Sequence, residues 1–428
     1  MEITVIGGGL AGVEAAYQVT RMGGRAIIYE MRPTVMTEAH QTSLLAELVC
    51  SNSLKSKDLS NAHGLLKEEL RRLGSIVLKV ADEMAIPGGK ALVVDRKRFA
   101  ERLTEMIVKH PAIHLLREEV SQIDDKGPVI IATGPLTSGP LAENIRLLTG
   151  KENLSFFDSI SPIIDASTVD YNEAFYASRY MKGEGDYLNC PLSSEEYDMF
   201  HEALVGAGRV GLRDFEKIPY FEGCLPVEVL AERGKKTLTY GPMKPVGLID
   251  PKNGRRPYAV VQLRKENASG SMLNMVGFQT KMKYSEQERV FRMVPALKKA
   301  VFLRYGSIHR NTYINAPLSL KVNLQSKTGR PIFFAGQLTG VEGYMEATAT
   351  GLMAGISASL SGSGKTFIQP PATTCIGALL KYLVTENKYF QPMNTNFGLL
   401  EGYTKRNKDD TVNTALAAID EWKKEVFP

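Results

Sequence analysis

Cysteine is scarce in this sequence, with four residues among 428, at positions 50, 190, 224 and 375. They have neither the C-x-x-C spacing of zinc and redox sites nor the density of a disulfide-stapled domain. The six histidines are scattered and lack the spacing of metal ligands. We therefore expect four reduced thiols, no metal site and no catalytic histidine.

Long apolar runs are also lacking. No stretch approaches the roughly 20 residues that a membrane-spanning helix needs, and the chain opens directly on "MEITVIGGG" without a basic leader. We expect a cytoplasmic protein. With 43% hydrophobic and 23% charged residues, the composition is that of a globular protein long enough for two domains.

The net charge of +5 is unevenly distributed. Residues 231–310 contain 17 Lys and Arg but 5 Asp and Glu, a balance of +12, which leaves the rest of the chain at −7. Tyrosine and phenylalanine are interleaved with these positive charges. This pattern is found on surfaces that bind nucleic-acid phosphates and stack on bases, and equally on a solvated face.

The N-terminal segment predicts a dinucleotide-binding βαβ unit. We expect a strand over Ile3–Ile6, a turn with Gly7, Gly9 and Gly12 in G-x-G-x-x-G register, a helix to about Met22 and a strand ending at Glu30. Glu30 is placed to accept from ribose hydroxyls, which favours FAD or NAD over a 2′-phosphate. The expected cofactor contacts here are Gly7, Gly8, Gly9, Leu10, Ala11, Gly12 and Glu30.

Two later segments favour FAD. "PVIIATGP" at 128–135 is a short strand whose Thr-Gly turn, with Gly134, can pass beside a bound dinucleotide. Residues 331–360 predict a strand, a loop carrying Gly336 and Gln337, and a helix of small residues from about Tyr344. The positive end of that helix would face the flavin. Its small residues also suit a tight packing face.

The stretch "PYFEGCLPVEVLAERG" at 219–234 places Cys224 outside any periodic apolar run. Gly223 allows a close backbone approach and Pro226 fixes the chain just beyond. This pattern indicates a presented thiol more than a packed one. Cys50 follows the apolar run "LLAEL", which we expect to be helical, and is open to either reading. Cys190 and Cys375 are interpreted as structural.

Several blocks together resemble one family. They are the glycine fingerprint, "VCSNSLKS" at 49–56, "YFEGCLPVEVLAERG" at 220–234, "GPMKPVGL" at 241–248, "FAGQLTGVEGYMEA" at 334–347 and "MNTNFGLL" at 393–400. The chain is similar nearly end to end to the bacterial folate- and FAD-dependent tRNA (uracil-54-C5)-methyltransferases. Some blocks occur more weakly in the related flavoproteins that modify wobble uridines.

The resemblance implies a mechanism and its residues. A thiolate, for which Cys224 is the candidate, adds to carbon 6 of uracil so that carbon 5 becomes nucleophilic. The carbon comes from 5,10-methylenetetrahydrofolate, reduced FAD carries and reduces it, and NADH or NADPH reduces FAD. The family block draws Cys50 towards the site as a second thiol. Which cysteine forms the covalent bond stays open.

The fold class expected is α/β: a Rossmann-like FAD domain of the two-dinucleotide-binding type, residues 1–150 and 300–428, with an inserted α+β domain, residues 151–299. The insertion carries most of the basic charge and would bind tRNA. Tyr344 is a candidate to stack near the isoalloxazine. Arg96 and Lys244 are candidates for folate carboxylates or tRNA phosphates, and Arg255 and Arg256 for tRNA phosphates.

Two other functions fit parts of this pattern. A wobble-uridine modifying flavoprotein would need a partner protein and a long helical C-terminal domain. A small-metabolite flavin oxidoreductase would leave the basic segment and Cys224 without a role. No obligatory protein partner and no membrane are expected.

Overall fold

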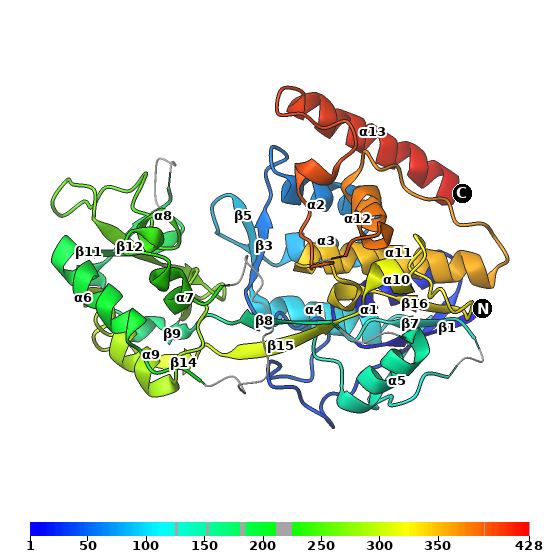
Figure 1. The fold of residues 1–428 in the computed structure, drawn as a ribbon, viewed down its shortest axis with the longest axis horizontal. Helices are drawn as coiled ribbons and strands as arrows, with labels where there is room; N and C mark the ends of the chain where they lie inside the picture. The colour runs from blue at the N-terminus through cyan, green and yellow to red at the C-terminus, as the bar shows by residue number, and fades with distance from the viewer. Residues whose placement is uncertain (125–126, 151–153, 180–184, 211–224, 389, 428) are drawn as a thin grey trace.

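Five short strands rich in Val, Ile and Phe form a parallel sheet in the order β16-β7-β1-β2-β6 in the computed structural model (Figure 1). Parallel sheets are covered on both faces, which explains why β7 and β16 are apolar and buried throughout. The strands are β1 (Glu2–Ile6), β2 (Arg25–Tyr29), β6 (Ile113–Leu116), β7 (Val129–Ile131) and β16 (Ile332–Phe334). The structure describes residues 1–124, 127–150, 154–179, 185–210, 225–388 and 390–427.

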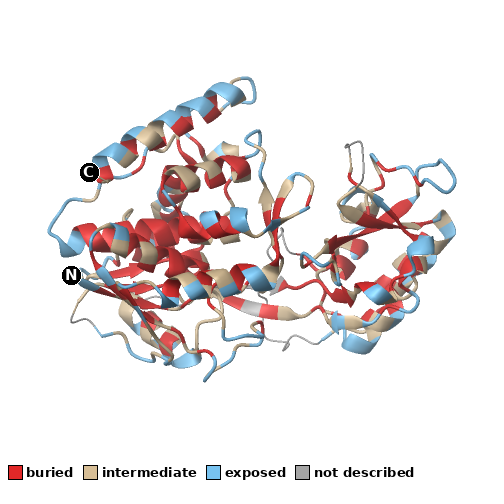
Figure 2. Ribbon diagram, turned by 180° about the vertical axis from the view of Figure 1, so that it is seen from behind, coloured by how far each residue is buried: buried red, intermediate tan, exposed pale blue. Residues whose placement is uncertain are grey.

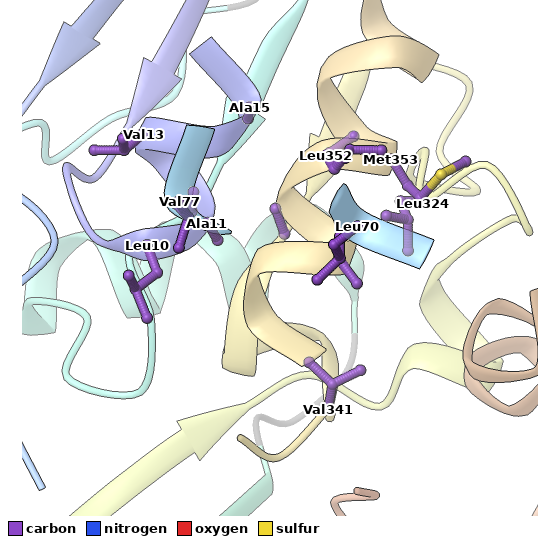
Figure 3. Packing of buried hydrophobic residues seen from close by; sticks show 14 of the residues in the cluster. Leu10, Ala11, Val13, Ala15, Leu70, Val77, Leu324, Val341, Leu352 and Met353 are labelled. Carbon is purple, nitrogen blue, oxygen red and sulfur yellow. The ribbon is translucent and has the colours of Figure 1, made fainter. Parts of the chain in front are cut away.

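Two helices from opposite ends of the chain pack side by side on this sheet. They are α1 (Leu10–Arg21) and α11 (Tyr344–Gly362). A Cβ at Gly351 would lie 2.3 Å from the carbonyl oxygen of Ala11, and one at Gly355 would lie 2.5 Å from that of Ala15. The small residues of α11 therefore do serve a close packing face. Figure 3 shows apolar side chains of the core on the two helices, among them Ala11 and Ala15 of α1 and Leu352 and Met353 of α11.

The remaining elements of this lobe surround that core. A small sheet has the order β3-β5-β4. The strands are β3 (Ser53–Ser56), β4 (Ala85–Ile86) and β5 (Ala91–Val94), and the helices are α2 (Ala62–Arg72), α3 (Ile76–Glu83), α4 (Arg96–Val108), α5 (Gly139–Thr149), α10 (Ala316–Ser319), α12 (Cys375–Val384) and α13 (Lys408–Val426).

The second lobe has its own antiparallel sheet, in the order β10-β11-β12-β13-β9-β14, and its own apolar core around Phe200, Phe278 and Phe291. Figure 2 shows buried residues gathered in each of the two lobes. The strands are β9 (Ile163–Asp165), β10 (Phe175–Ala177), β11 (Tyr187–Leu192), β12 (Ala259–Lys265), β13 (Met272–Met275) and β14 (Phe302–Arg304), and the helices are α6 (Ser194–Val205), α7 (Val227–Glu232), α8 (Thr237–Tyr240) and α9 (Tyr284–Phe291).

An antiparallel ribbon joins the lobes. It consists of β8 (Leu154–Ser159) and β15 (Ile308–Tyr313), which run out and back between them (Figure 1). The chain thus enters and leaves the second lobe along one path, as an insertion requires. The expected α/β fold with an inserted α+β unit is confirmed, and the division at residues 151–299 stays a prediction.

The predicted βαβ unit is confirmed to within one or two residues, since α1 ends at Arg21 and β2 at Tyr29. The helix expected at residues 44–48 is wrong. That segment has a turn at Leu45 and Ala46, and Ala46 has a φ of +52°, which an α-helix does not allow. Leu45, Ala46 and Leu48 are buried all the same, so their apolar character reflects burial and not a helical face. Among the described helices, none is both long and apolar enough to cross a membrane.

Candidate functional site: two adjoining pockets

The glycine turn after β1 has three different tasks. Gly7 has a φ of +106°, which favours glycine. A Cβ at Gly12 would lie 1.8 Å from the carbonyl oxygen of Gly7, so Gly12 lets helix and turn meet. A Cβ at Gly9 would have no atom within 4 Å. The space above Gly9 is therefore open for a ligand.

The start of α1 is prepared for an anion. Gly9 is its N-cap, no side chain caps it, and its first turn holds no acidic residue. The free N–H groups and the positive end of the helix dipole therefore face this space. Such a terminus suits the pyrophosphate of a dinucleotide.

A pocket with about 1040 Å³ of empty space, part of it open to solvent, lies over this turn. Ten of the eleven predicted cofactor residues line it. Gly12 does not, because it packs against Gly7. The ten are Gly7, Gly8, Gly9, Leu10, Ala11, Glu30, Gly134, Gly336, Gln337 and Tyr344. The space, the open glycine and the helix terminus fit a dinucleotide, and each residue's contact with it stays a prediction.

Glu30 is held at the edge of this pocket. Its carboxylate accepts from Gly8 N at 2.9 Å and from Arg32 Nε at 2.8 Å. Burial opposes ionisation of Glu30, but the hydrogen bonds and charge of Arg32 outweigh it and hold the pKa of Glu30 below its usual range. Glu30 is therefore an ionised acceptor, as the proposed ribose contact requires.

A second pocket, with about 1160 Å³ of empty space, adjoins the first. Cys50 lines it, together with the polar side chains of Lys55, His63, His309 and Glu346. Six residues line both pockets and form the wall between them: Val49, Pro135, Leu136, Gln337, Tyr344 and Ala347. A ligand in one pocket therefore lies beside a ligand in the other.

Tyr344 joins this wall to the segment of Cys50. Its hydroxyl oxygen accepts from the backbone N–H of Cys50 at 2.9 Å and of Ser51 at 3.2 Å. Burial raises the pKa of Tyr344 well above its usual value, so the phenol stays neutral.

Glu346 is the buried acid of the second pocket. Its Oε1 lies 3.0 Å from Thr395 N, 3.3 Å from His63 Nδ1 and 3.9 Å from Lys55 Nζ. Among the described residues, Oε2 has no hydrogen-bond partner. Burial opposes ionisation, but the positive charge of Lys55 and the contact with His63 keep the pKa of Glu346 below its usual range. The free oxygen is an acceptor available to a ligand N–H.

The basic residues predicted to bind substrate lie elsewhere. Arg255 and Arg256 are exposed in the second lobe, Lys244 is half-buried there, and none of the three lines either pocket. Arg96 binds Glu266 at 2.8 Å and the carbonyl oxygen of Leu48 at 2.6 Å. These contacts indicate that Arg96 holds the segment of Cys50 in place and does not bind a ligand directly.

Cys224 lies outside the described residues. The next described residue along the chain is Leu225, and two residues later Val227 N donates to Gln279 O at 2.7 Å. Gln279 lines the second pocket.

The two cysteines interpreted as structural are fully buried, which confirms that interpretation. Burial raises the pKa of Cys190 to about 12 and that of Cys375 well above its usual value. Neither thiol lines either of the two pockets described above.

Sequence reasoning missed several residues of the two pockets. Arg32, His63 and His309 stand in no motif, and their pairing with distant residues gives no local signal. Lys55 and Glu346 lie inside the quoted blocks "VCSNSLKS" and "FAGQLTGVEGYMEA", so those blocks were the available signal.

Comparison with known proteins agrees with this geometry. Residues 2–366 match the family model "Glucose inhibited division protein A". Crystal structures of Aquifex aeolicus GidA superpose with a TM-score of 0.74 at 17% and 18% identity, covering all of this chain and 74% and 76% of those chains, and so share its fold.

Curated relatives are much more similar in sequence. The methylenetetrahydrofolate–tRNA-(uracil-5-)-methyltransferase TrmFO of Sulfurihydrogenibium sp. is 51% identical over 100% of this chain and 99% of its own length. The enzyme of that name from Heliobacterium modesticaldum is 55% identical over 95% of this chain and 93% of its own length. The chain therefore belongs to the methylenetetrahydrofolate–tRNA-(uracil-5-)-methyltransferase family, within the wider glucose inhibited division protein A family.

Proposed function

We propose that this chain methylates carbon 5 of uridine 54 in the T loop of tRNA, with 5,10-methylenetetrahydrofolate as the carbon donor and FAD as the cofactor. The observation that carries this proposal is the shared wall between the two pockets. A dinucleotide over the glycine turn would lie beside a second pocket that is lined by Cys50 and a buried carboxylate.

FAD fits the first pocket, with the pyrophosphate at the start of α1 and a ribose near Glu30. When bound and reduced by NADH or NADPH, FAD supplies the hydride that turns the transferred carbon into a methyl group. Tyr344 and Gln337, on the shared wall, would border the reactive ring. These residues orient the ring and separate it from bulk water.

Folate and the target uracil would meet in the second pocket. Its acceptor oxygen on Glu346 and its donors on Lys55 and His63 suit a ring with an N–H beside a carbonyl, which both the pterin and the uracil present. Cys50 lies at the same pocket as a second thiol.

The nucleophile we propose is Cys224. Its thiolate adds to carbon 6 of uracil, and the resulting enolate attacks the one-carbon unit from carbon 5. Loss of the proton from carbon 5 lets the bond between the transferred carbon and its carrier nitrogen break, which leaves an exocyclic methylene group. Addition of hydride to that methylene makes the methyl group, and elimination of the Cys224 thiolate from the resulting enolate restores the ring double bond. In the described part of the same sequence block, Val227 contacts Gln279, which lines the second pocket.

The basic stretch at residues 231–310 would bind tRNA. We place both the enzyme and its tRNA substrate in the cytoplasm.

The proposed function is tested by analysing the modified nucleosides in tRNA from a strain that lacks the gene. Loss of 5-methyluridine at position 54, restored by the wild-type gene, is the expected result. An unchanged T loop with altered wobble uridines would favour the alternative of a wobble-modifying flavoprotein, which the full-length identity to the named methyltransferases disfavours.

A further inference from the structure

Three arginine side chains converge on residues 48–52, the segment that carries Cys50. Arg96 opens α4 in the first lobe, whereas Arg264 lies in β12 and Arg304 ends β14 in the second lobe. The segment of Cys50 is therefore held from both lobes at once.

Two of the arginines bind backbone carbonyls just before Cys50. Arg96 Nη1 donates to Leu48 O at 2.6 Å and lies 3.3 Å from Val49 O. Arg304 Nη1 donates to Val49 O at 3.0 Å, and its Nη2 donates to Ala39 O at 3.1 Å.

Arg264 binds the two side chains just after Cys50. Its Nε donates to Asn52 Oδ1 at 3.0 Å, and its Nη2 donates to Ser51 Oγ at 2.8 Å. With Tyr344 accepting from Cys50 N, all five residues of the segment have a defined partner. A forked guanidinium makes such paired contacts, which a lysine cannot reproduce.

Positive charge exceeds negative charge around this segment. Glu266, which is 1% exposed, pairs with Arg96, while Arg264 is 5% exposed and donates to the neutral side chains of Asn52 and Ser51. Burial, and then the charge of Arg96, lowers the pKa of Arg304. An anion at this segment would reduce the repulsion between the positive charges of Arg96, Arg264 and Arg304. The other titratable groups that line the second pocket are Lys55, His63, His309, Glu342, Tyr344 and Glu346, and Glu47 lies next to the segment in the first pocket.

Cys190 shows what burial does without such charges. Burial raises the pKa of its thiol to about 12. The surroundings of Cys50 differ in two respects. Cys50 lines a pocket, with its Sγ 4.0 Å from Ser159 O, and it interacts electrostatically with Arg96, Arg264 and Arg304.

We propose that Arg96, Arg264 and Arg304 are positioning residues that hold Cys50 as a thiolate facing the second pocket. The clamp spans the two lobes, so docking of the inserted lobe sets the state of the thiol. Only the use of this thiolate in methyl transfer rests on the proposed function.

The test is the pH dependence of Cys50 alkylation by iodoacetamide, followed by peptide mass spectrometry in a Cys224→Ser background. Neither tRNA nor folate is present, so a failure of the proposed function would not affect the result. In the otherwise unchanged protein, alkylation should reach half its maximal rate well below the pH at which a free thiol, with a pKa of about 8.5, would do so. An ordinary thiol profile there overturns the proposal without any arginine variant.

The variants separate charge from geometry. Arg264→Gln and Arg304→Gln should lower the alkylation rate at pH 7 about tenfold, as a shift of one pH unit would. Arg264→Lys should keep the pH profile of alkylation because the charge stays. In the protein that retains Cys224, assayed separately with tRNA and folate, the same substitution should slow methyl transfer because the fork is lost. Arg292→Gln is the matched control, since Arg292 contacts Ala300 and Glu288 in the same lobe. Profiles that are unchanged in both Gln variants, or shifted equally by Lys and Gln, overturn the proposal.

Discussion

The hydroxyl oxygen of Tyr344 accepts a hydrogen bond of 2.9 Å from the backbone N–H of Cys50. Tyr344 also lines both pockets, so one side chain links the proposed flavin site to the thiol of the second pocket. Tyr344 therefore positions the segment of Cys50 and also forms part of the wall between the two pockets.

Tyr344→Phe should keep FAD but slow methyl transfer about tenfold or more. The ring stays in the wall, while the N–H groups of Cys50 and Ser51 lose their acceptor, at a cost of about 1–3 kcal/mol. Thermal unfolding and single-turnover methylation measure the two effects. Tyr382→Phe, which loses a hydrogen bond to Gln391 O away from both pockets, is the control. A Phe variant as fast as wild type would remove Tyr344 from the positioning scheme.

Substitutions in the glycine turn should separate binding from folding. Gly9→Ala should fold and bind FAD because its Cβ has free space, whereas Gly9→Asp should fold without FAD because it places a carboxylate near the pyrophosphate. Gly12→Ala should destabilise the fold by about 3 kcal/mol, because its Cβ would overlap Gly7 O. The visible spectrum after denaturation reports the bound flavin. Full flavin content in Gly9→Asp would place the cofactor elsewhere.

The glycine turn was predictable because its signal is local: strand, glycines and helix lie within 30 residues, and each is required by backbone geometry. The surroundings of Cys50 were not. Arg264 reaches Asn52 across 212 positions and Arg304 reaches Val49 across 255, and no spacing rule connects such residues. The same holds for His63 beside Glu346. The apolar run before Cys50 was wrongly predicted to be a helix. Its residues are apolar because they are buried, and their spacing does not follow the period of a helix.

Charge reversal at Arg255 and Arg256 should weaken tRNA binding and flatten its dependence on salt, with the log–log slope falling by about two. Both residues are exposed on the second lobe and line neither pocket, so flavin reduction should not change. Reversal of Lys97 on α4 and of Lys109 directly after it, each about three-quarters exposed, is the matched control. Equal salt slopes for both double variants would mean that the basic stretch is a solvated surface that does not bind tRNA.

Lys67 should make stability depend on pH. Burial lowers the pKa of Lys67 to about 7, and its Nζ donates to Ser56 O and His63 O beneath the second pocket. Between about pH 7 and 10 the unfolded chain holds a proton that the folded Lys67 has lost, so stability rises with pH over this range. The melting temperature of wild type minus that of Lys67→Met should therefore increase from pH 7 to 10. A constant difference contradicts this assignment, and Lys79→Met at an exposed site on α3 is the comparison.

Cys224→Ala should keep FAD and its reduction by nicotinamide but slow methyl transfer on the order of a thousandfold or more, because carbon 5 is not activated without addition at carbon 6. With 5-fluorouridine at position 54, the fluorine cannot leave as the proton does, so the adduct should persist. Peptide mapping should place the RNA on Cys224. An adduct on Cys50 would exchange the two roles.

The central claim is tested most directly by following the carbon atom. Purified protein is incubated with a tRNA transcript, a nicotinamide reductant and 5,10-methylenetetrahydrofolate carrying ¹³C in its methylene group, and the nucleosides are resolved by mass spectrometry. The account predicts ¹³C in 5-methyluridine at position 54, and none when folate is omitted or position 54 is cytidine. Reduced flavin with unlabelled tRNA, or label at another position, would contradict it.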